Sequence, residues 1–214
     1  MARPLCAEKR KSIILSAIHL FYNEGFNAPT SKIAREAKVS EGTIFTYFKN
    51  KQDLLEKVFL FLKNDLYEKL QLSDEISEET CIIETFKTNF HNYIDYGLNY
   101  PERSILVSRF LLSKQIPLEY IQSIHDLFSQ LISFIDLLRT TGPLKDVPLD
   151  LAINIFTNMG NNVIHYCIIH NVDDRDLIDE YAKVNFEAAW LALTGESVEA
   201  TRERFKAEQI CPQA

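Results

Sequence analysis

The amino-acid sequence predicts an all-α protein in which a small N-terminal domain of three helices precedes a larger helical bundle. Apolar residues recur at the helical spacing of three and four along most of the 214 residues. Only six glycines occur, which argues against a turn-rich β architecture and against glycine-rich phosphate loops. Pro101, Pro117 and Pro148 each stand where a new helical pattern begins, a position that tolerates the missing N–H group.

The N-terminal domain is expected within residues 1–52, with a first helix over 8–23 and two short helices that end near residues 37 and 47. One face of the first helix is apolar, with Ile14, Ala17, Ile18 and Phe21. Gly25 follows it where a left-handed cap is needed. Thr30 or Ser31 caps the second helix, and Ser40 caps the third. A fourth helix over 51–70 connects this domain to the rest and carries an apolar stripe of Leu55, Phe59, Leu62, Leu66 and Leu70.

The larger domain is expected over residues 53–195, followed over 196–214 by a polar C-terminal tail that adds one short, marginal helix. Its helices are predicted near residues 78–98, 101–113, 117–140, 148–170 and 175–193. The segment Ser73-Asp74-Glu75 is the first clear break in the pattern. Thr141-Gly142-Pro143 and Gly195 mark later helix ends.

Charge is distributed unevenly, although the net charge of −7 alone argues against a nucleic-acid partner. Residues 1–52 contain nine Lys and Arg against four acidic residues, a balance of +5, and the remainder carries −12. A basic head on an acidic body favours a head that meets phosphate and a body that repels it. A chance gradient is the alternative interpretation.

Four cysteines are scattered along the chain without any CxxC pairing: Cys6, Cys81, Cys167 and Cys211. This pattern favours a reducing compartment over a disulfide framework. Cys167 and His170 have the spacing of helical metal ligands, but we interpret them as ordinary core and helix-end residues and expect no metal or cofactor. Because neither a signal-peptide pattern nor a run of 18 apolar residues occurs, we expect a cytoplasmic protein without a membrane segment.

Residues 31–48, with the sequence SKIAREAKVSEGTIFTYF, predict two short helices joined by a tight connection. The small Ala34 and Ala37 let the helices cross closely, so that Ile33 packs against Ile44 and Phe48. This arrangement is typical of a DNA-binding helix-turn-helix, whose second helix reads the bases. Its hydroxyls can bind phosphates or base edges, its Thr and Phe can touch a thymine methyl, and its glycine allows close backbone approach. The outward positions are Glu41, Gly42, Thr43, Phe45, Thr46 and Tyr47.

The same region resembles the TetR (tetracycline-repressor) family of bacterial regulators over residues 9–59. Matching positions are Ile14-Leu15-x-Ala17, Leu20-Phe21, Gly25, Thr30, Ile33-Ala34-x-x-Ala37, Val39-Ser40-x-Gly42-Thr43, Tyr47-Phe48-x-x-Lys51 and Leu54-Leu55. Lys38 departs from the family, which usually has glycine in this turn. The resemblance implies that Thr30 and Lys51 bind phosphates and that the reading helix faces the bases. Capping or packing within the domain is the alternative for each residue. The expected DNA-binding residues are Thr30, Ser31, Ser40, Glu41, Gly42, Thr43, Phe45, Thr46, Tyr47 and Lys51.

The resemblance also implies a homodimer through the last two long helices, which lets two reading helices meet one palindromic site. Small residues on the last helix permit close helix approach, although packing inside one chain is the alternative explanation for them. The expected interface consists of Ile153, Gly160, Ile164, Tyr181, Asn185, Ala188, Ala189 and Ala192.

Neutral polar side chains occupy one face of the helix at 148–170, namely Asn154, Asn158, Asn161, Asn162 and His165. An interface, a cavity wall and plain solvent are the alternatives for this face. Aromatic faces near 86–93 and 121–132 are expected to be mainly core, but a sensor pocket would be built from such faces. The candidate pocket consists of Phe86, Phe90, Tyr93, His125, Phe128, Asn158, Asn161 and His165.

These features predict a sequence-specific DNA-binding transcriptional regulator, a homodimeric repressor released from a palindromic double-stranded DNA operator by a small, largely apolar effector. A helical ligand-binding adaptor or an enzyme is the alternative. The sequence contains no nucleophile elbow, P-loop, HExxH or dinucleotide fingerprint, so we expect no enzymatic activity.

Overall fold

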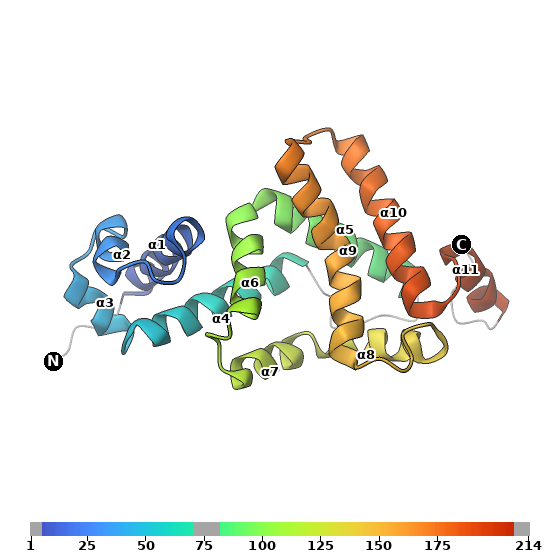
Figure 1. The fold of residues 1–214 in the computed structure, drawn as a ribbon, viewed down its shortest axis with the longest axis horizontal. Helices are drawn as coiled ribbons and strands as arrows, with labels where there is room; N and C mark the ends of the chain where they lie inside the picture. Colours follow the sequence, from blue (N-terminus) through green and yellow to red (C-terminus); the bar gives the residue numbers. More distant parts are fainter. Residues whose placement is uncertain (1–5, 71–81, 208–214) are drawn as a thin grey trace. The chain divides into compact units, whose positions relative to one another are not determined.

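The computed structural model describes residues 6–70 and 82–207, apart from the side chains of Ile124 and His125. Within these ranges every regular element is a helix, which confirms the all-α prediction (Figure 1). The elements are α1 (Ala7–Glu24), α2 (Thr30–Glu36), α3 (Glu41–Tyr47), α4 (Lys51–Leu70), α5 (Ile82–Asn99), α6 (Pro101–Ser113), α7 (Leu118–Leu127), α8 (Ser129–Leu138), the 3₁₀ helix η1 (Arg139–Thr141), α9 (Leu149–His170), α10 (Arg175–Thr194) and α11 (Val198–Ala207).

These elements form two compact units that do not follow the order of the chain. The first unit comprises Met1–Leu66 and Tyr100–Ile124, and the second comprises Tyr67–Asn99 and His125–Ala214. Helix α6 therefore belongs with the N-terminal helices. The functional boundary expected between residues 52 and 53 stays a prediction, because compactness alone does not assign function.

The first unit is built on the apolar faces that the sequence predicts. The buried face of α1 consists of Ile13, Ile14, Ala17, Ile18 and Phe21, and the stripe of α4 from Leu55 to Leu66 is likewise buried. Helix α6 adds an aromatic contact, because the ring of Phe110 lies 4.4 Å from Phe26 and 5.5 Å from Phe59 between centroids. Burial of these rings holds α6 to the N-terminal helices.

The turn between α2 and α3 closes on a left-handed residue that is not glycine. Lys38 has a φ of 55°, and its N–H donates to the Arg35 carbonyl at 3.1 Å. The Val39 N–H reaches the Ala34 carbonyl at 2.9 Å. These two bonds are the paired cap that ends many helices, and they usually enclose a glycine. The turn expected of a helix-turn-helix is therefore present although Lys38 replaces that residue.

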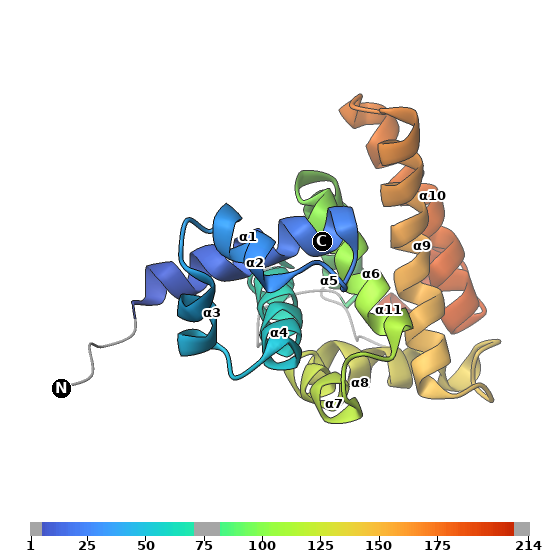
Figure 2. The ribbon, with the colours of Figure 1, turned by 60° about the vertical axis from the view of Figure 1, so that its left-hand side comes forward.

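The second unit surrounds a cluster of aromatic rings contributed by α5, α9 and α10. Phe86 lies 5.8 Å from Phe156 and 6.0 Å from Trp190 between ring centroids. Phe90 lies 5.6 Å from both Phe156 and Phe186. Helices α9 and α10 lie side by side in both views (Figures 1 and 2) and pack extensively on each other.

Glycines allow close contacts at two places in the second unit. A Cβ atom on Gly97 would lie 2.3 Å from Ile164 Cδ1, so α5 and α9 cross at this glycine. A Cβ atom on Gly142 would lie 1.7 Å from the Leu193 carbonyl oxygen, so the turn after η1 rests directly on the end of α10. No side chain fits at Gly142 without backbone movement.

Two sequence predictions of elements were wrong. The single helix expected over 117–140 is broken at Phe128, which has a φ of −105° and a ψ of 18° between α7 and α8. The C-terminal tail is more than polar, because Val198 and Phe205 of α11 are buried in the core of the second unit. Ser73-Asp74-Glu75 and the expected start of the helix near residue 78 lie outside the described residues.

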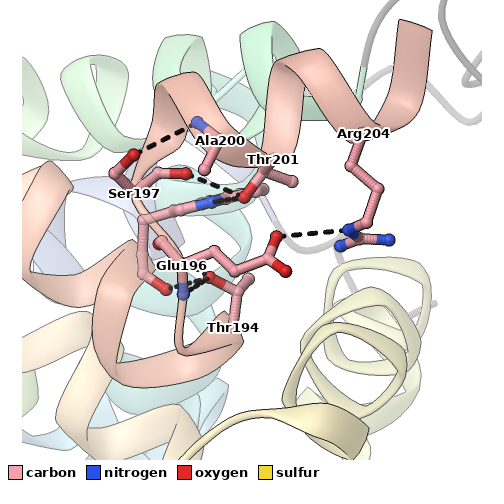
Figure 3. Close-up of polar contacts among 7 residues, drawn as sticks. Thr194, Glu196, Ser197, Ala200, Thr201 and Arg204 are labelled. Atoms are coloured by element: carbon pink, nitrogen blue, oxygen red, sulfur yellow. Dashed lines mark hydrogen bonds and ion pairs between the residues drawn. The ribbon is translucent and has the colours of Figure 1, made fainter. Parts of the chain in front are cut away.

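Polar contacts fix the junction of α10 and α11 (Figure 3). The Ser197 hydroxyl accepts from the Ala200 N–H at 3.1 Å, as a helix N-cap does. Arg204 pairs with Glu196 across 3.2 Å, and the buried Trp190 indole donates to the Thr201 hydroxyl at 3.0 Å. Because this buried hydrogen bond joins Trp190 of α10 to Thr201 of α11, α11 is an integral part of the second unit.

Candidate nucleic-acid interface

Helix α3 turns one side to the core of the first unit and the other to solvent. Ile44 and Phe48 are buried, whereas Gly42, Phe45 and Thr46 are exposed. Phe45 retains 47 % of its accessible surface, an unusual exposure for an aromatic residue on a seven-residue helix. Three of the residues expected to face DNA therefore lie on the exposed side of α3, namely Gly42, Phe45 and Thr46.

The threonine hydroxyls on this face are already engaged in local hydrogen bonds. Ser40 caps α3, because its Oγ accepts from the Thr43 N–H at 3.3 Å and lies 2.8 Å from Thr43 Oγ1. The Thr46 hydroxyl donates to the Gly42 carbonyl at 3.1 Å. A hydroxyl that donates its proton in this way keeps its lone pairs, so Thr46 can accept from a base amino group.

Tyr47 connects the reading helix to the start of α1. Its phenolic oxygen accepts from the backbone N–H of Cys6 at 3.1 Å. An accepted bond leaves the phenol proton available for donation to a phosphate oxygen. Arg10, also at the start of α1, lies over the Phe48 ring with 5.5 Å between its guanidinium carbon and the ring centroid. The set of candidate residues drawn from the sequence did not include Cys6 and Arg10, because only the folded head brings α1 to α3.

Lys51 opens α4 beside a well-formed helix cap. Asn50 Oδ1 accepts from the Asp53 N–H at 2.9 Å, and Asp53 Oδ2 accepts from the Lys49 N–H at 2.8 Å. These two bonds fix the first turn of α4, and with it the base of the Lys51 side chain. Partial burial lowers the pKa of the Lys51 ammonium group below its ordinary value.

Two acidic side chains of the head form contacts, one with a hydroxyl group and one with an ammonium group. The Thr30 hydroxyl, on the first residue of α2, donates to Glu41 Oε1 at 2.6 Å. The Lys32 ammonium group pairs with Glu24 at 2.7 Å. Neither contact joins neighbours in sequence, so neither was predicted. Ser31, the remaining candidate on α2, is exposed.

Gly42 has no structural requirement in the chain alone. It lies in helical backbone, and a Cβ atom placed on it would meet no heavy atom within 4 Å beyond its chain neighbours and the backbone of α3 itself. Neither a left-handed conformation nor a close contact explains a glycine here, although glycine weakens a helix. Gly42 therefore leaves the backbone of α3 uncovered at this position.

The candidate pocket residues do not share one environment. Phe86, Phe90 and Phe128 are buried core residues, packed against Phe156 or, for Phe128, against Tyr67 at 5.4 Å between centroids. Asn158 and His165 are exposed on α9, and the side chain of His125 lies outside the described residues. The described residues of this set therefore do not form one cavity wall.

Tyr93 and Asn161 are the exception among the candidate pocket residues. The Tyr93 hydroxyl donates to Asn161 Oδ1 at 2.7 Å, and Asn161 Nδ2 donates to Asn158 at 3.1 Å. Burial raises the pKa of Tyr93 to about 12, so the phenol stays protonated. A short polar chain thus leads from the core to the exposed face of α9.

Three of the residues expected at the dimer interface are buried inside the chain, so that assignment was wrong for them. Ile164 and Ala189 have 0 % and 1 % exposed surface, and Gly160 is buried beside Tyr93. Their small size or shape serves packing within one chain, so they do not lie on a surface. Ile153, Tyr181, Asn185 and Ala192 are half-buried and Ala188 is exposed. These five stay available to a dimer contact.

Other site types find no support in the described residues. No group of three or more His, Cys, Asp and Glu side chains in the described ranges is arranged to hold a metal ion. Cys167 is buried in the core of the second unit, where burial raises the pKa of its thiol. None of the described helices has both the length and the apolar character needed to cross a membrane.

The N-terminal helices match a known family. A family model described as "Bacterial regulatory proteins, tetR family" matches residues 13–58, which span the candidate interface. These helices therefore form a DNA-binding domain of the TetR type, and the chain is a DNA-binding transcriptional regulator.

Longer matches to known regulators extend the similarity into the second unit. The fatty acid metabolism regulator protein of Bacillus subtilis is 27 % identical over 135 residues, which span 63 % of this chain and 68 % of the relative. A TetR family transcription regulator from Marinobacter aquaeolei VT8 superposes with a TM-score of 0.75 at 22 % identity, over 86 % and 95 % of the two chains. The transcriptional regulator FadR from Bacillus subtilis, solved in complex with stearoyl-CoA, has a TM-score of 0.58 at 20 % identity, over 87 % and 98 %.

Proposed function

We propose that this protein is a homodimeric repressor of the TetR family that binds a palindromic DNA operator and is released from it by a small apolar ligand. The observation that carries the DNA-binding part is the exposed face of α3, where Phe45, Thr46 and the open Gly42 stand together on the basic head. A short helix with a bare backbone and outward hydroxyls suits insertion into the major groove.

The candidate DNA contacts divide into those that position the protein on the phosphates and those that read the bases. Lys51 and the Tyr47 hydroxyl are cationic or proton-donating, so they suit phosphate oxygens, which position the head without reading sequence. Thr46 and Phe45 suit base edges, because the Thr46 oxygen can accept from an amino group and both side chains can touch a thymine methyl. We therefore expect replacement of Thr46 to change sequence preference and replacement of Lys51 to weaken binding to all sequences.

The proposed dimer uses the outer face of α9 and α10. Ile169 and Val184 are 71 % and 58 % exposed, and Leu151 and Leu191 also remain about half exposed. The same two helices line a shallow groove of about 280 Å³, formed by Asn162, Val163, Tyr166, Tyr181 and Asn185. Exposed apolar side chains on two long neighbouring helices favour an interface between copies. A twofold axis would then present two α3 helices to one palindrome.

The dimer is tested by placing a charge on this face. Val184→Glu adds a carboxylate to an exposed position, so the single chain should fold, but an apolar interface would have to desolvate the charge. Lys183→Glu is the control, because Lys183 is also exposed but points about 100° away from Val184 around α10. We expect light scattering at low micromolar concentration to give two chains for the parent and the control, and one chain for Val184→Glu. A Val184→Glu dimer would exclude this surface.

For the effector we propose a long-chain acyl group. Support comes from the relative named as a fatty acid metabolism regulator and from the similar structure in complex with stearoyl-CoA. The aromatic core of the second unit supplies the apolar chemistry that an acyl chain requires. A hundredfold loss of DNA affinity needs about 2.7 kcal/mol of coupling between the two sites.

One titration tests both parts of the proposal. The protein is bound to labelled fragments from upstream of its own gene, and stearoyl-CoA or free coenzyme A is then added. We expect selective binding to one fragment and release by stearoyl-CoA but not by free coenzyme A. Equal binding to all fragments would overturn the proposed operator, whereas selective binding without release would overturn only the acyl effector.

A further inference from the structure

Thr30 and Glu41, both expected to face DNA, hold each other in the protein alone. Thr30 begins α2 and Glu41 begins α3, and the Thr30 hydroxyl donates to Glu41 Oε1 at 2.6 Å. A hydrogen bond to a charged acceptor is roughly twice as strong as a neutral one. Glu41 is exposed and forms no ion pair with the Lys and Arg residues that the structure describes, so its charge is not cancelled by a cation there.

This bond conflicts with a phosphate at the same place. A hydroxyl has one proton, and the proton that Thr30 gives to Glu41 is not available to a phosphate oxygen. A phosphate that reached Thr30 would also meet the Glu41 carboxylate, which carries the same sign of charge. The Lys32–Glu24 pair contrasts with this contact, because its two charges cancel locally. Glu41 therefore opposes DNA of any sequence unless it finds another partner.

The major groove offers a carboxylate only a few partners. Guanine presents two acceptors there, which repel a carboxylate, and adenine presents an acceptor beside its amino group. Cytosine presents an amino donor alone, and carboxylate side chains accept from that group. A cytosine placed beside the first turn of α3 would take the Glu41 carboxylate and free the Thr30 hydroxyl for a phosphate.

We propose, on the basis of the proposed DNA-binding function, that Glu41 is a specificity-determining residue of this protein. On arbitrary DNA it keeps the Thr30 hydroxyl occupied and repels the backbone. On the operator it turns to the amino group of a cytosine, one in each half-site, and Thr30 binds the adjacent phosphate. Glu41 thus lowers the affinity for non-specific DNA and favours sites with a cytosine at one position of each half-site.

The test compares two variants that remove one negative charge each. Glu41→Gln keeps the shape of the side chain, and Glu36→Gln is the matched control, because Glu36 is exposed at the end of α2. Sites are selected from a random duplex library with each protein, and affinities for the selected site and for random duplex are measured by fluorescence anisotropy at one salt concentration. We expect Glu41→Gln to bind random duplex about tenfold more tightly, to gain less on the operator and to lose the requirement for cytosine.

A double variant shows whether the effect passes through Thr30. Thr30→Val removes the hydroxyl, so Glu41→Gln should bring a smaller gain on random duplex in that background. The inference is overturned if Glu41→Gln and Glu36→Gln change the ratio of specific to non-specific affinity equally, or if the gain is the same without the Thr30 hydroxyl. A parent protein that selects no site would overturn the proposed function itself, and the inference with it.

Discussion

Replacing Gly42 with alanine should separate stability from DNA binding, because the chain alone leaves space for the added methyl group. Beyond its chain neighbours and the backbone of α3 itself, no heavy atom lies within 4 Å of the position that its Cβ would occupy, and the backbone there is helical. Alanine is the better helix former by about 0.5–1 kcal/mol. Because a change of 1 kcal/mol shifts the midpoint of a chain of this size by about 2–4 °C, we expect thermal unfolding to occur about 1–4 °C higher.

DNA affinity should move in the opposite direction. Each methyl group stands on the exposed face of α3, and overpacking a close contact costs about 1–3 kcal/mol. Even the lower value, applied to the two copies in a dimer, exceeds the 1.4 kcal/mol that corresponds to tenfold. We therefore expect Gly42→Ala to lose at least about tenfold in operator affinity, measured by fluorescence anisotropy.

Gly195→Ala is the control, because it should change the stability of the protein without changing its DNA affinity. Gly195 has a φ of 76° at the end of α10, so alanine there adopts a left-handed conformation at a cost of about 1 kcal/mol. That variant should unfold at a lower temperature and bind DNA as the parent does. If Gly42→Ala binds the operator with unchanged affinity, α3 does not approach DNA closely and the assigned reading face is wrong.

Three further predictions concern the fold. Gly142→Ala should lower the free energy of unfolding by several kcal/mol in a denaturant titration, since its Cβ would overlap the Leu193 carbonyl; wild-type stability would refute this contact. Lys38→Gly should raise the thermal midpoint by a degree or two, because glycine relieves the positive φ of that turn, and a lower midpoint would contradict the strain argument. Burial lowers the pKa of His91 below its unfolded value, so the native state binds fewer protons near pH 6 and stability falls as the pH drops below about 6.5. His91→Gln should flatten that fall in urea titrations at pH 7 and pH 5.5, and an unchanged slope would exclude His91 as its source.

The sequence was sufficient to predict the N-terminal helices and their apolar faces. Ile14, Phe21 and Ile44 follow helical spacing, and their periodicity requires one buried side. The exposed side of α3 follows from the same periodicity by exclusion. Contacts such as Thr30 with Glu41, which lie eleven residues apart, depend on how two helices cross and leave no mark in a local pattern.

The second unit was less predictable because its packing is tertiary. The apolar pattern continues through Phe128, so nothing in the spacing marks the break between α7 and α8. Gly160 and Ile164 resembled interface residues because small and branched residues serve close packing both within and between chains. Only the crossing with α5, where Ile164 meets Gly97, assigns them to the core. The burial of Phe205 had only a weak signal in the sequence, where it is a lone aromatic residue in a polar tail.

The central claim is that the basic head binds DNA through its phosphates while α3 reads the bases, and salt dependence tests it most directly. A dimer with on the order of six phosphate contacts should show a slope of about −5 when the logarithm of the binding constant is plotted against that of the salt concentration. Lys51→Ala removes one contact from each copy and should change this slope to between about −3 and −4, on operator and random duplex alike. An unchanged slope for Lys51→Ala, or a parent protein whose DNA affinity does not depend on salt, would contradict the account.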